Sequence, residues 1–204
     1  MENPNNEHFG GVFYINLNKR SDRREEIEKE LNSMEMTYER FEGIEMKPGI
    51  VGCGYSHLAV LKEARDRGLP NVLIFEDDFE FLVSKKDFWT NINSFFEKRI
   101  PYDVLMFSYN IEQSKPFNDL VFKVNAATTA SAYVVNSYFY DSIISLYEEN
   151  LPILKSTGKH WIYANDQIWK RLQPGSAWYA FNIRLGRQRG SYSDNSLEYM
   201  DRGV

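Results

Sequence analysis

Residues 72–75 read Val-Leu-Ile-Phe, and three acidic residues follow them without a break. Four consecutive apolar residues with β-branched members are typical of a strand that is buried on both faces of a parallel sheet. Such a strand requires helices on both sides of the sheet, because both of its faces must be covered by apolar side chains. This run therefore favours a layered α/β fold.

Apolar runs and amphipathic helical patterns alternate along the rest of the chain. Asp22 and Glu25 fit a capping box that opens the first helix, and residues 49–54 form a glycine-rich connection before the second. We expect strands at 12–17, 72–75, 104–107, 121–124, 132–135 and 178–183, and helices at 22–34, 58–64, 88–96, 138–146 and 165–172. The alternation predicts one α/β domain over residues 1–204, with a mostly parallel, mixed central sheet flanked by helices. We expect residues 1–10 to be a flexible N-terminus and residues 186–204 a polar tail that closes over the site.

The chain carries a formal net charge of −5 and a single cysteine, Cys53. A chain with this charge has no basic field to attract nucleic acid, and one cysteine cannot form an intrachain disulfide. Residues 1–9 lack the basic start and apolar run of a signal peptide, and no apolar run is long enough to span a bilayer. We therefore expect a soluble, cytoplasmic protein with no nucleic-acid partner.

The acidic triplet Glu76-Asp77-Asp78 directly follows the expected buried strand. Three neighbouring carboxylates repel one another in a low-dielectric setting unless a cation compensates them. Ligands of open α/β sheets bind beyond the carboxyl ends of strands, and carboxylate oxygens select magnesium or manganese. The triplet thus indicates a metal–phosphate site; the alternative is a solvated strand end that caps the next segment.

A basic cluster comes where the first expected strand leaves the sheet, formed by Asn16, Lys19, Arg20, Arg23 and Arg24. Arginine recognises phosphate through its planar fork, so the cluster suits a diphosphate. The alternative is a solvated helix face, which we favour for Arg24. For Arg20 and Arg23 both interpretations stay open.

A third feature is the run Gly-Cys-Gly-Tyr-Ser-His at residues 52–57. A glycine-rich turn that enters a helix lets a ligand approach backbone N–H groups, and Ser56 and His57 would face it from the first turn. Capping or packing is the alternative for His57. Cys53 has no evident neighbouring base, and we expect it to act as a small hydrophobe.

Together these segments resemble glycosyltransferase family 25, which includes lipooligosaccharide and collagen galactosyltransferases. Residues 12–24 look like its opening signature, residues 52–57 its G-C-x-x-S-H element, and residues 72–78 its v-l-I-f-E-D-D strand. Residues 130–136 are similar to its a-t-x-a-Y strand, and Asn165-Asp166 falls at an acidic position of the family. Gln188 with Ser193-Asp194 resembles its closing element.

The resemblance implies a GT-A-like (Rossmann-like) fold and a metal-dependent, inverting hexosyltransferase. Its donor would be a UDP-sugar carrying galactose or glucose, and its acceptor a hydroxyl of a glycan or a glycosylated protein. The metal, Mn²⁺ or Mg²⁺, would be held by Glu76, Asp77 and Asp78. Donor-binding residues carried over from the family are Asn16, Arg20, Arg23, Ser56, His57, Glu76, Asp77 and Gln188.

An inverting displacement also needs a carboxylate that takes the proton of the acceptor hydroxyl. Asp166 is our candidate for this base, although an Asn-Asp pair is also a common helix N-cap. Asp194 is the second candidate. We expect Trp161, Trp169 and Trp178 in the core; the alternative is that they stack on a sugar or base. A catalytically silent nucleotide-sugar or glycan-binding module remains the alternative function, whereas a nucleotidyltransferase is disfavoured because residues 16–24 contain no glycine.

Overall fold

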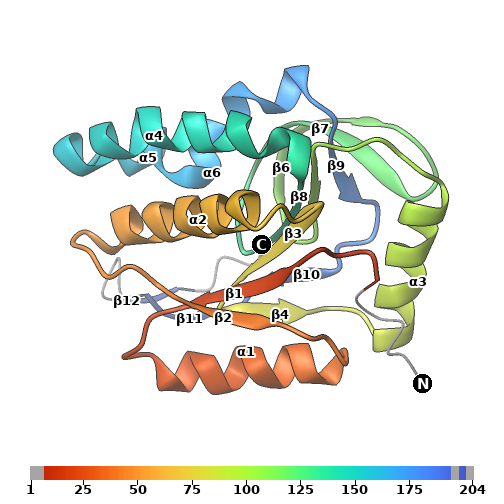
Figure 1. The fold of residues 1–204 in the computed structure, drawn as a ribbon, viewed down its shortest axis with the longest axis horizontal. Helices are drawn as coiled ribbons and strands as arrows, with labels where there is room; N and C mark the ends of the chain where they lie inside the picture. The colour runs from red at the N-terminus through yellow and green to blue at the C-terminus, as the bar shows by residue number, and fades with distance from the viewer. Residues whose placement is uncertain (1–6, 194–197, 201–204) are drawn as a thin grey trace.

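A computed structural model of the protein describes residues 7–193 and 198–200. In these ranges, helices cover both faces of one large sheet (Figure 1). Its eight strands have the order β2-β1-β3-β8-β5-β9-β7-β6. They are β1 (Val12–Asn16), β2 (Glu39–Glu42), β3 (Asn71–Glu76), β5 (Val104–Met106), β6 (Asn110–Pro116), β7 (Val121–Thr128), β8 (Ala132–Asn136) and β9 (Trp178–Phe181).

Strand directions make the sheet mixed but mostly parallel. β1 is parallel to β2 and β3, and β5 is parallel to β9. β8 is antiparallel to both β3 and β5, and β7 is antiparallel to both β9 and β6. Only β7 and β8 of the eight strands therefore run against the rest. The predicted mostly parallel, mixed sheet is confirmed.

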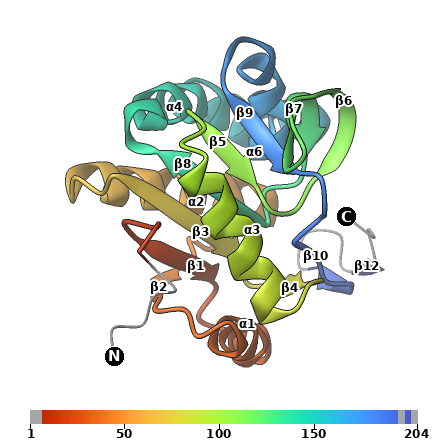
Figure 2. The same cartoon turned by 90° about the vertical axis from the view of Figure 1, so that its right-hand side faces the viewer.

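The helices form one layer on each side of the sheet. They are α1 (Ser21–Ser33), α2 (Gly49–Asp66), α3 (Lys85–Glu97), α4 (Tyr140–Thr157), α5 (His160–Tyr163) and α6 (Asn165–Ile168). α2 and α4 lie side by side on one face, and α1 and α3 pack against the other (Figures 1 and 2). β3 shows why: Val72 and Ile74 join the core under α2 and α4, while Leu73 and Phe75 join the core under α1 and α3.

Two predictions about helix starts are wrong. The first helix has Arg20 at its N-cap and no side-chain cap, so Asp22 and Glu25 form no capping box. Asp22 instead pairs with Arg20, whose Nη2 lies 2.7 Å from Oδ2 of Asp22. The second helix, α2, begins at Gly49, so the predicted glycine-rich connection is part of the helix.

Close packing explains the glycines inside α2. A Cβ at Gly52 would lie 2.2 Å from the carbonyl oxygen of Ile44, and one at Gly54 would lie 2.4 Å from the Leu151 side chain. Real side chains do not approach so closely, so glycine lets α2 contact both its preceding loop and α4. The segment that looks like a turn in the sequence is therefore a contact surface of a helix.

The chain ends also differ from expectation. Phe9 is buried, and the N–H of Gly10 donates to Oδ1 of Asn71 at 2.8 Å, so this part of the expected flexible N-terminus contacts the rest of the domain. The expected last strand ends at Phe181, and more strands follow it. β10 (Gly186–Gln188) pairs with β4 (Phe79–Phe81), and β11 (Ser191–Ser193) pairs with β12 (Glu198–Met200). Short polar strands carry no apolar period, which is why the pattern missed them.

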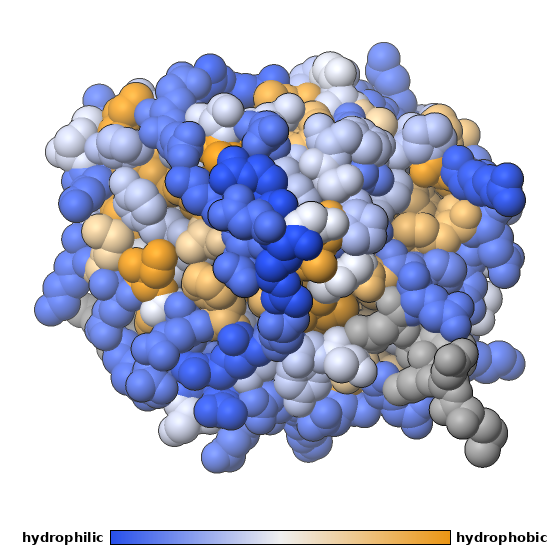
Figure 3. Space-filling model, viewed as in Figure 1, coloured by the Kyte–Doolittle hydropathy of each residue, from blue (hydrophilic) through white to orange (hydrophobic). Residues whose placement is uncertain are grey.

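Hydrophilic residues cover most of the face seen in Figure 3, with smaller apolar areas between them. Within the ranges that the structure describes, none of the helices combines the length and the apolarity needed to cross a membrane.

Gly52→Ala should destabilise the protein, although alanine is the better helix former. The added methyl meets the backbone oxygen of Ile44, which cannot move as a flexible side chain would. We expect a loss of about 1–3 kcal/mol in the free energy of unfolding, measured with denaturant. Gly175→Ala is the matched control, because its Cβ would meet nothing within 4 Å. Equal stability of the two variants would contradict the packing role of Gly52.

Candidate functional site

Two of the three acids are held at the carboxyl end of β3 by residues from β1 and α1. Nδ2 of Asn16 donates to Oδ2 of Asp77 at 2.8 Å. Nη1 of Arg23 donates to Oδ1 of Asp77 at 3.0 Å and to Oδ2 of Asp78 at 3.3 Å. Asn16, Asp77 and Asp78 are buried, and Arg23 is largely so. The structure thus brings together four of the residues that the sequence assigned to the donor and metal sites.

Asp78 has a carboxylate that its surroundings compensate only in part. Nε2 of Gln188 donates to its Oδ2 at 3.0 Å, whereas its buried Oδ1 has no hydrogen-bond partner among the described residues. Burial and the negative charge of Glu76 raise the pKa of Asp78 to about 7, against the lowering effect of Arg23. Burial also raises the pKa of Asp77, despite Arg23 and Asn16.

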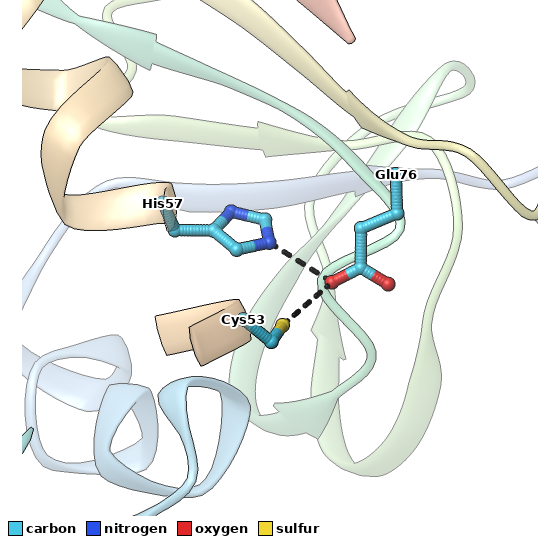
Figure 4. A group of neighbouring side chains, drawn as sticks. All are labelled: Cys53, His57 and Glu76. Atoms are coloured by element: carbon cyan, nitrogen blue, oxygen red, sulfur yellow. Dashed lines mark hydrogen bonds and ion pairs between the residues drawn. The ribbon is translucent and has the colours of Figure 1, made fainter. Parts of the chain in front are cut away.

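Glu76 contacts a different set of residues (Figure 4). Its Oε1 lies 2.9 Å from Nε2 of His57 and accepts a hydrogen bond from Sγ of Cys53 at 3.4 Å. Burial opposes ionisation of Glu76, but the contacts with His57 and Cys53 outweigh it and lower its pKa. Nδ1 of His57 lies 2.7 Å from the hydroxyl of Tyr133. The three acids therefore divide between two adjacent clusters.

The Cys53 cluster contains partners that the sequence reasoning missed. Burial and the nearby Glu76 raise the pKa of the Cys53 thiol well above its usual value, so the thiol keeps its proton. Nδ2 of Asn165 lies 3.8 Å from its sulfur. The spacing of Cys53 and His57, four residues apart on one helix, was the available signal that they share a face.

Ser56 does not face a ligand from a first helical turn as predicted. It is buried in α2, its hydroxyl donates to the carbonyl oxygen of Gly52 at 2.7 Å, and it accepts from the N–H of Ile44 at 2.8 Å. Ser56 therefore fixes the loop before α2. The prediction failed because α2 begins at Gly49, at the start of the glycine-rich run and not after it.

The basic residues that follow β1 also contact different partners. Lys19 pairs with Glu45 at 2.7 Å, and Nε of Arg24 lies 2.9 Å from Glu28, which confirms the surface interpretation of Arg24. Arg20 pairs with Asp22 at the start of α1. Arg23 alone of these four cations has a described hydrogen bond to the acidic triplet.

Asp166 is fixed by the backbone of a neighbouring loop. Its Oδ2 accepts a hydrogen bond from the N–H of Thr129 at 3.1 Å, and Thr129 has a positive φ of 83°. Such a conformation is strained for a β-branched residue and is found at functional sites. The N-cap of α6 is Ala164, so the alternative of an Asn-Asp cap is wrong. Asp166 contributes to the negative field at Cys53, whereas Asp194 lies outside the described residues.

The tryptophans were expected in the core, and for two of them this is confirmed. Trp169 and Trp178 are fully buried, but Trp161 is 62% exposed. Trp161 lines a cavity of about 330 Å³ together with Gln167 and Arg171. The expectation for Trp161 is wrong: it lies on the four-residue helix α5, none of whose residues is buried.

No family model matches the chain. Procollagen galactosyltransferase 1-A of Xenopus laevis is 27% identical over 131 residues, which are 50% of this chain and 21% of that protein. Procollagen galactosyltransferase 1 of Danio rerio is 33% identical over 103 residues, 37% of this chain and 17% of that protein. The chain thus spans about a fifth or less of the length of these curated relatives.

A solved structure shares the fold: a glycosyltransferase involved in the glycosylation of the major capsid of PBCV-1. Its TM-score is 0.51 at 12% identity, over 92% of this chain and 95% of that one. The GT-A-like fold class is therefore confirmed. The similarity to procollagen galactosyltransferases likewise confirms the resemblance to glycosyltransferase family 25. The names of the curated relatives and of this solved structure are those of glycosyltransferases.

Asp78→Asn should remove a pH dependence of stability. The folded protein holds the Asp78 proton more tightly than the unfolded chain, so this group favours folding below pH 4 and that contribution is lost as the pH rises to about 7. The variant should match the wild type near pH 4 and exceed it by up to about 4 kcal/mol near pH 8. Chemical denaturation across this range measures the difference. Asp119→Asn, at an exposed position, is the control, and a difference independent of pH would refute the assignment.

Proposed function

We propose that this chain is a metal-dependent, inverting glycosyltransferase. It would move a hexose, galactose or glucose, from a UDP-sugar to a hydroxyl of a glycan or protein. The observation that carries the proposal is the buried pair Asp77-Asp78 with Arg23 across it, at the end of the sheet where ligands of α/β proteins bind. The similarity to procollagen galactosyltransferases supports galactose as the sugar.

The residues of this pair fit a hard divalent cation. Carboxylate oxygens are the ligands that Mn²⁺ and Mg²⁺ prefer, and Oδ1 of Asp78 is buried with no described hydrogen-bond partner. Asp77 and Asp78 would hold the ion, with Glu76 beside them. When bound, the ion would act as a Lewis acid toward the departing diphosphate.

The neighbouring side chains position these acids. Asn16 orients Asp77, and Gln188 orients Asp78 from the strand β10. Arg23 places a permanent positive charge beside both carboxylates, where negative charge gathers as a diphosphate leaves. Preorganised charge of this kind needs no rearrangement during the reaction.

Asp166 is the proposed general base. One of its oxygens accepts the Thr129 N–H, which fixes the carboxylate in place. It would take the proton of the acceptor hydroxyl as that oxygen bonds to the sugar carbon, on the face opposite the leaving diphosphate. Asp194 remains the second candidate for this role.

A donor panel tests the function. We expect one nucleotide sugar to raise the melting temperature only when Mn²⁺ is present, and free nucleoside diphosphate to be released slowly. Asp78→Ala should lose both effects because it removes the proposed ligand, whereas Asp119→Ala, an exposed acid, should keep them. Stabilisation without release would favour the silent binding module. If no donor stabilises the protein, the nucleotide-sugar proposal fails.

Asp166→Asn should lower kcat of transfer by about 10²- to 10⁴-fold, since the amide cannot accept the proton. Donor binding, measured by the Mn²⁺-dependent thermal shift, should stay unchanged because the hydrogen bonds described for Asp166 are with Thr129 and Asn165 and not with the Asp77-Asp78 pair. Glu112→Gln, an exposed acid on β6, is the control. Full activity of Asp166→Asn would move the base role to Asp194.

A further inference from the structure

We propose that Cys53, His57 and Glu76 form a second cation site, selective for zinc or a similar thiophilic divalent ion and separate from the Asp77-Asp78 pair. One ligand atom from each residue lies within 4.8 Å of the other two. Nε2 of His57 is 2.9 Å from Oε1 of Glu76, and Sγ of Cys53 is 3.4 Å from the same oxygen. Ligand atoms around a tetrahedral zinc are roughly 3.5 Å apart, so small side-chain rotations make room for the ion.

The site is built on two rigid elements. Cys53 and His57 lie one turn apart on the same face of α2, and Glu76 is the last residue of β3 (Figure 4). The close contacts of Gly52 and Gly54 fix α2 against the loop before it and against α4. The two helical ligands therefore keep their distance from Glu76 without a bound ion.

Second contacts orient the ligands as they do in known zinc sites. The other ring nitrogen of His57, Nδ1, lies 2.7 Å from the hydroxyl of the fully buried Tyr133, which leaves Nε2 directed toward the cluster. Metal-ligating histidines almost always have such a partner on their second nitrogen. Nδ2 of the Asn165 amide lies 3.8 Å from the sulfur of Cys53.

The donor set determines the type of metal. Sulfur, imidazole and carboxylate ligands are those of zinc, whereas manganese and magnesium prefer sites of oxygen alone, such as the Asp77-Asp78 pair. The negative charges of Glu76, Asp166 and Asp78 act on Cys53, so the region attracts a cation. As the S–Zn bond forms, the thiol proton leaves to solvent.

Three protein ligands leave the fourth position of a tetrahedral zinc open. The His57 side chain is fully buried, but that of Glu76 is 20% exposed and Cys53 is partly exposed. Glu76 and Cys53 thus keep part of their surface accessible to solvent, and a water molecule would complete the coordination.

Cobalt titration of the full chain tests the site. Cys53 is the only cysteine, so a thiolate-to-cobalt absorption band can arise from this residue alone. We expect one equivalent of Co²⁺ to produce the band and Zn²⁺ to abolish it by displacement. Cys53→Ala should lose the band and bind Zn²⁺ at least about tenfold more weakly, whereas Asp119→Asn, at an exposed position, should keep both properties.

Tyr133→Phe tests the orienting contact, because it removes one hydroxyl and creates no large cavity. We expect about tenfold weaker Zn²⁺ binding with the thiolate band retained. In the wild type, Zn²⁺ should protect Cys53 from alkylation, and Mn²⁺ at the same concentration should not. This measurement needs no variant, so it decides the question even if Cys53→Ala does not fold.

Two results would overturn the site. One is Co²⁺ binding without a thiolate band. The other is alkylation of Cys53 at the same rate with and without Zn²⁺. Either would leave the cluster as a hydrogen-bonded part of the fold, and neither bears on the donor site, which the Mn²⁺-dependent thermal shift and Asp78→Ala report independently.

Discussion

Arg23 donates hydrogen bonds to two neighbouring carboxylates, and through this contact α1 is tied to the end of the central strand β3. Burying Asp77 and Asp78 without a positive charge would cost several kcal/mol. Asp78 also holds the segment that contains β10. Gln188 donates to the Asp78 carboxylate, and the N–H of Arg189 donates to the Asp78 carbonyl oxygen at 2.6 Å. One guanidinium thus helps to determine where α1, β3 and β10 meet, and the proposed donor site lies at that meeting point.

The layered fold was predictable because the central strands are continuous apolar runs, and such runs indicate strands that are covered on both faces. Residues 71–75 are all buried, as a strand covered on both faces must be. The direction of β8 was not predictable, since its apolar run is the same in a parallel and an antiparallel strand. β4 and β10 were missed because three-residue strands with polar members have no period to detect.

The candidate site was predictable where the residues are adjacent in sequence and not where the fold brings them together. The acidic triplet and Arg23 could be identified from local patterns. The division of the triplet could not, because Glu76 leaves the other two acids for His57 and Cys53, about 20 residues earlier in the chain. Nothing in the sequence around Thr129 indicates its contact with Asp166. The contact depends on a positive φ at Thr129, which a threonine does not predict.

The place of β5 in the sheet has a consequence for how the chain acquires its structure during synthesis. β5 pairs only with β8 and β9 in the described sheet, and both follow it in sequence. β1, β2 and β3, by contrast, pair among themselves within the first 76 residues, so their contacts are local. A nascent chain can therefore pair the three strands β2, β1 and β3, which carry Asn16 and Glu76, before β8 is added beside β3. Residues 104–106 stay without strand partners until the ribosome has released residue 136, and this apolar segment is the one most exposed to misassociation in the interval.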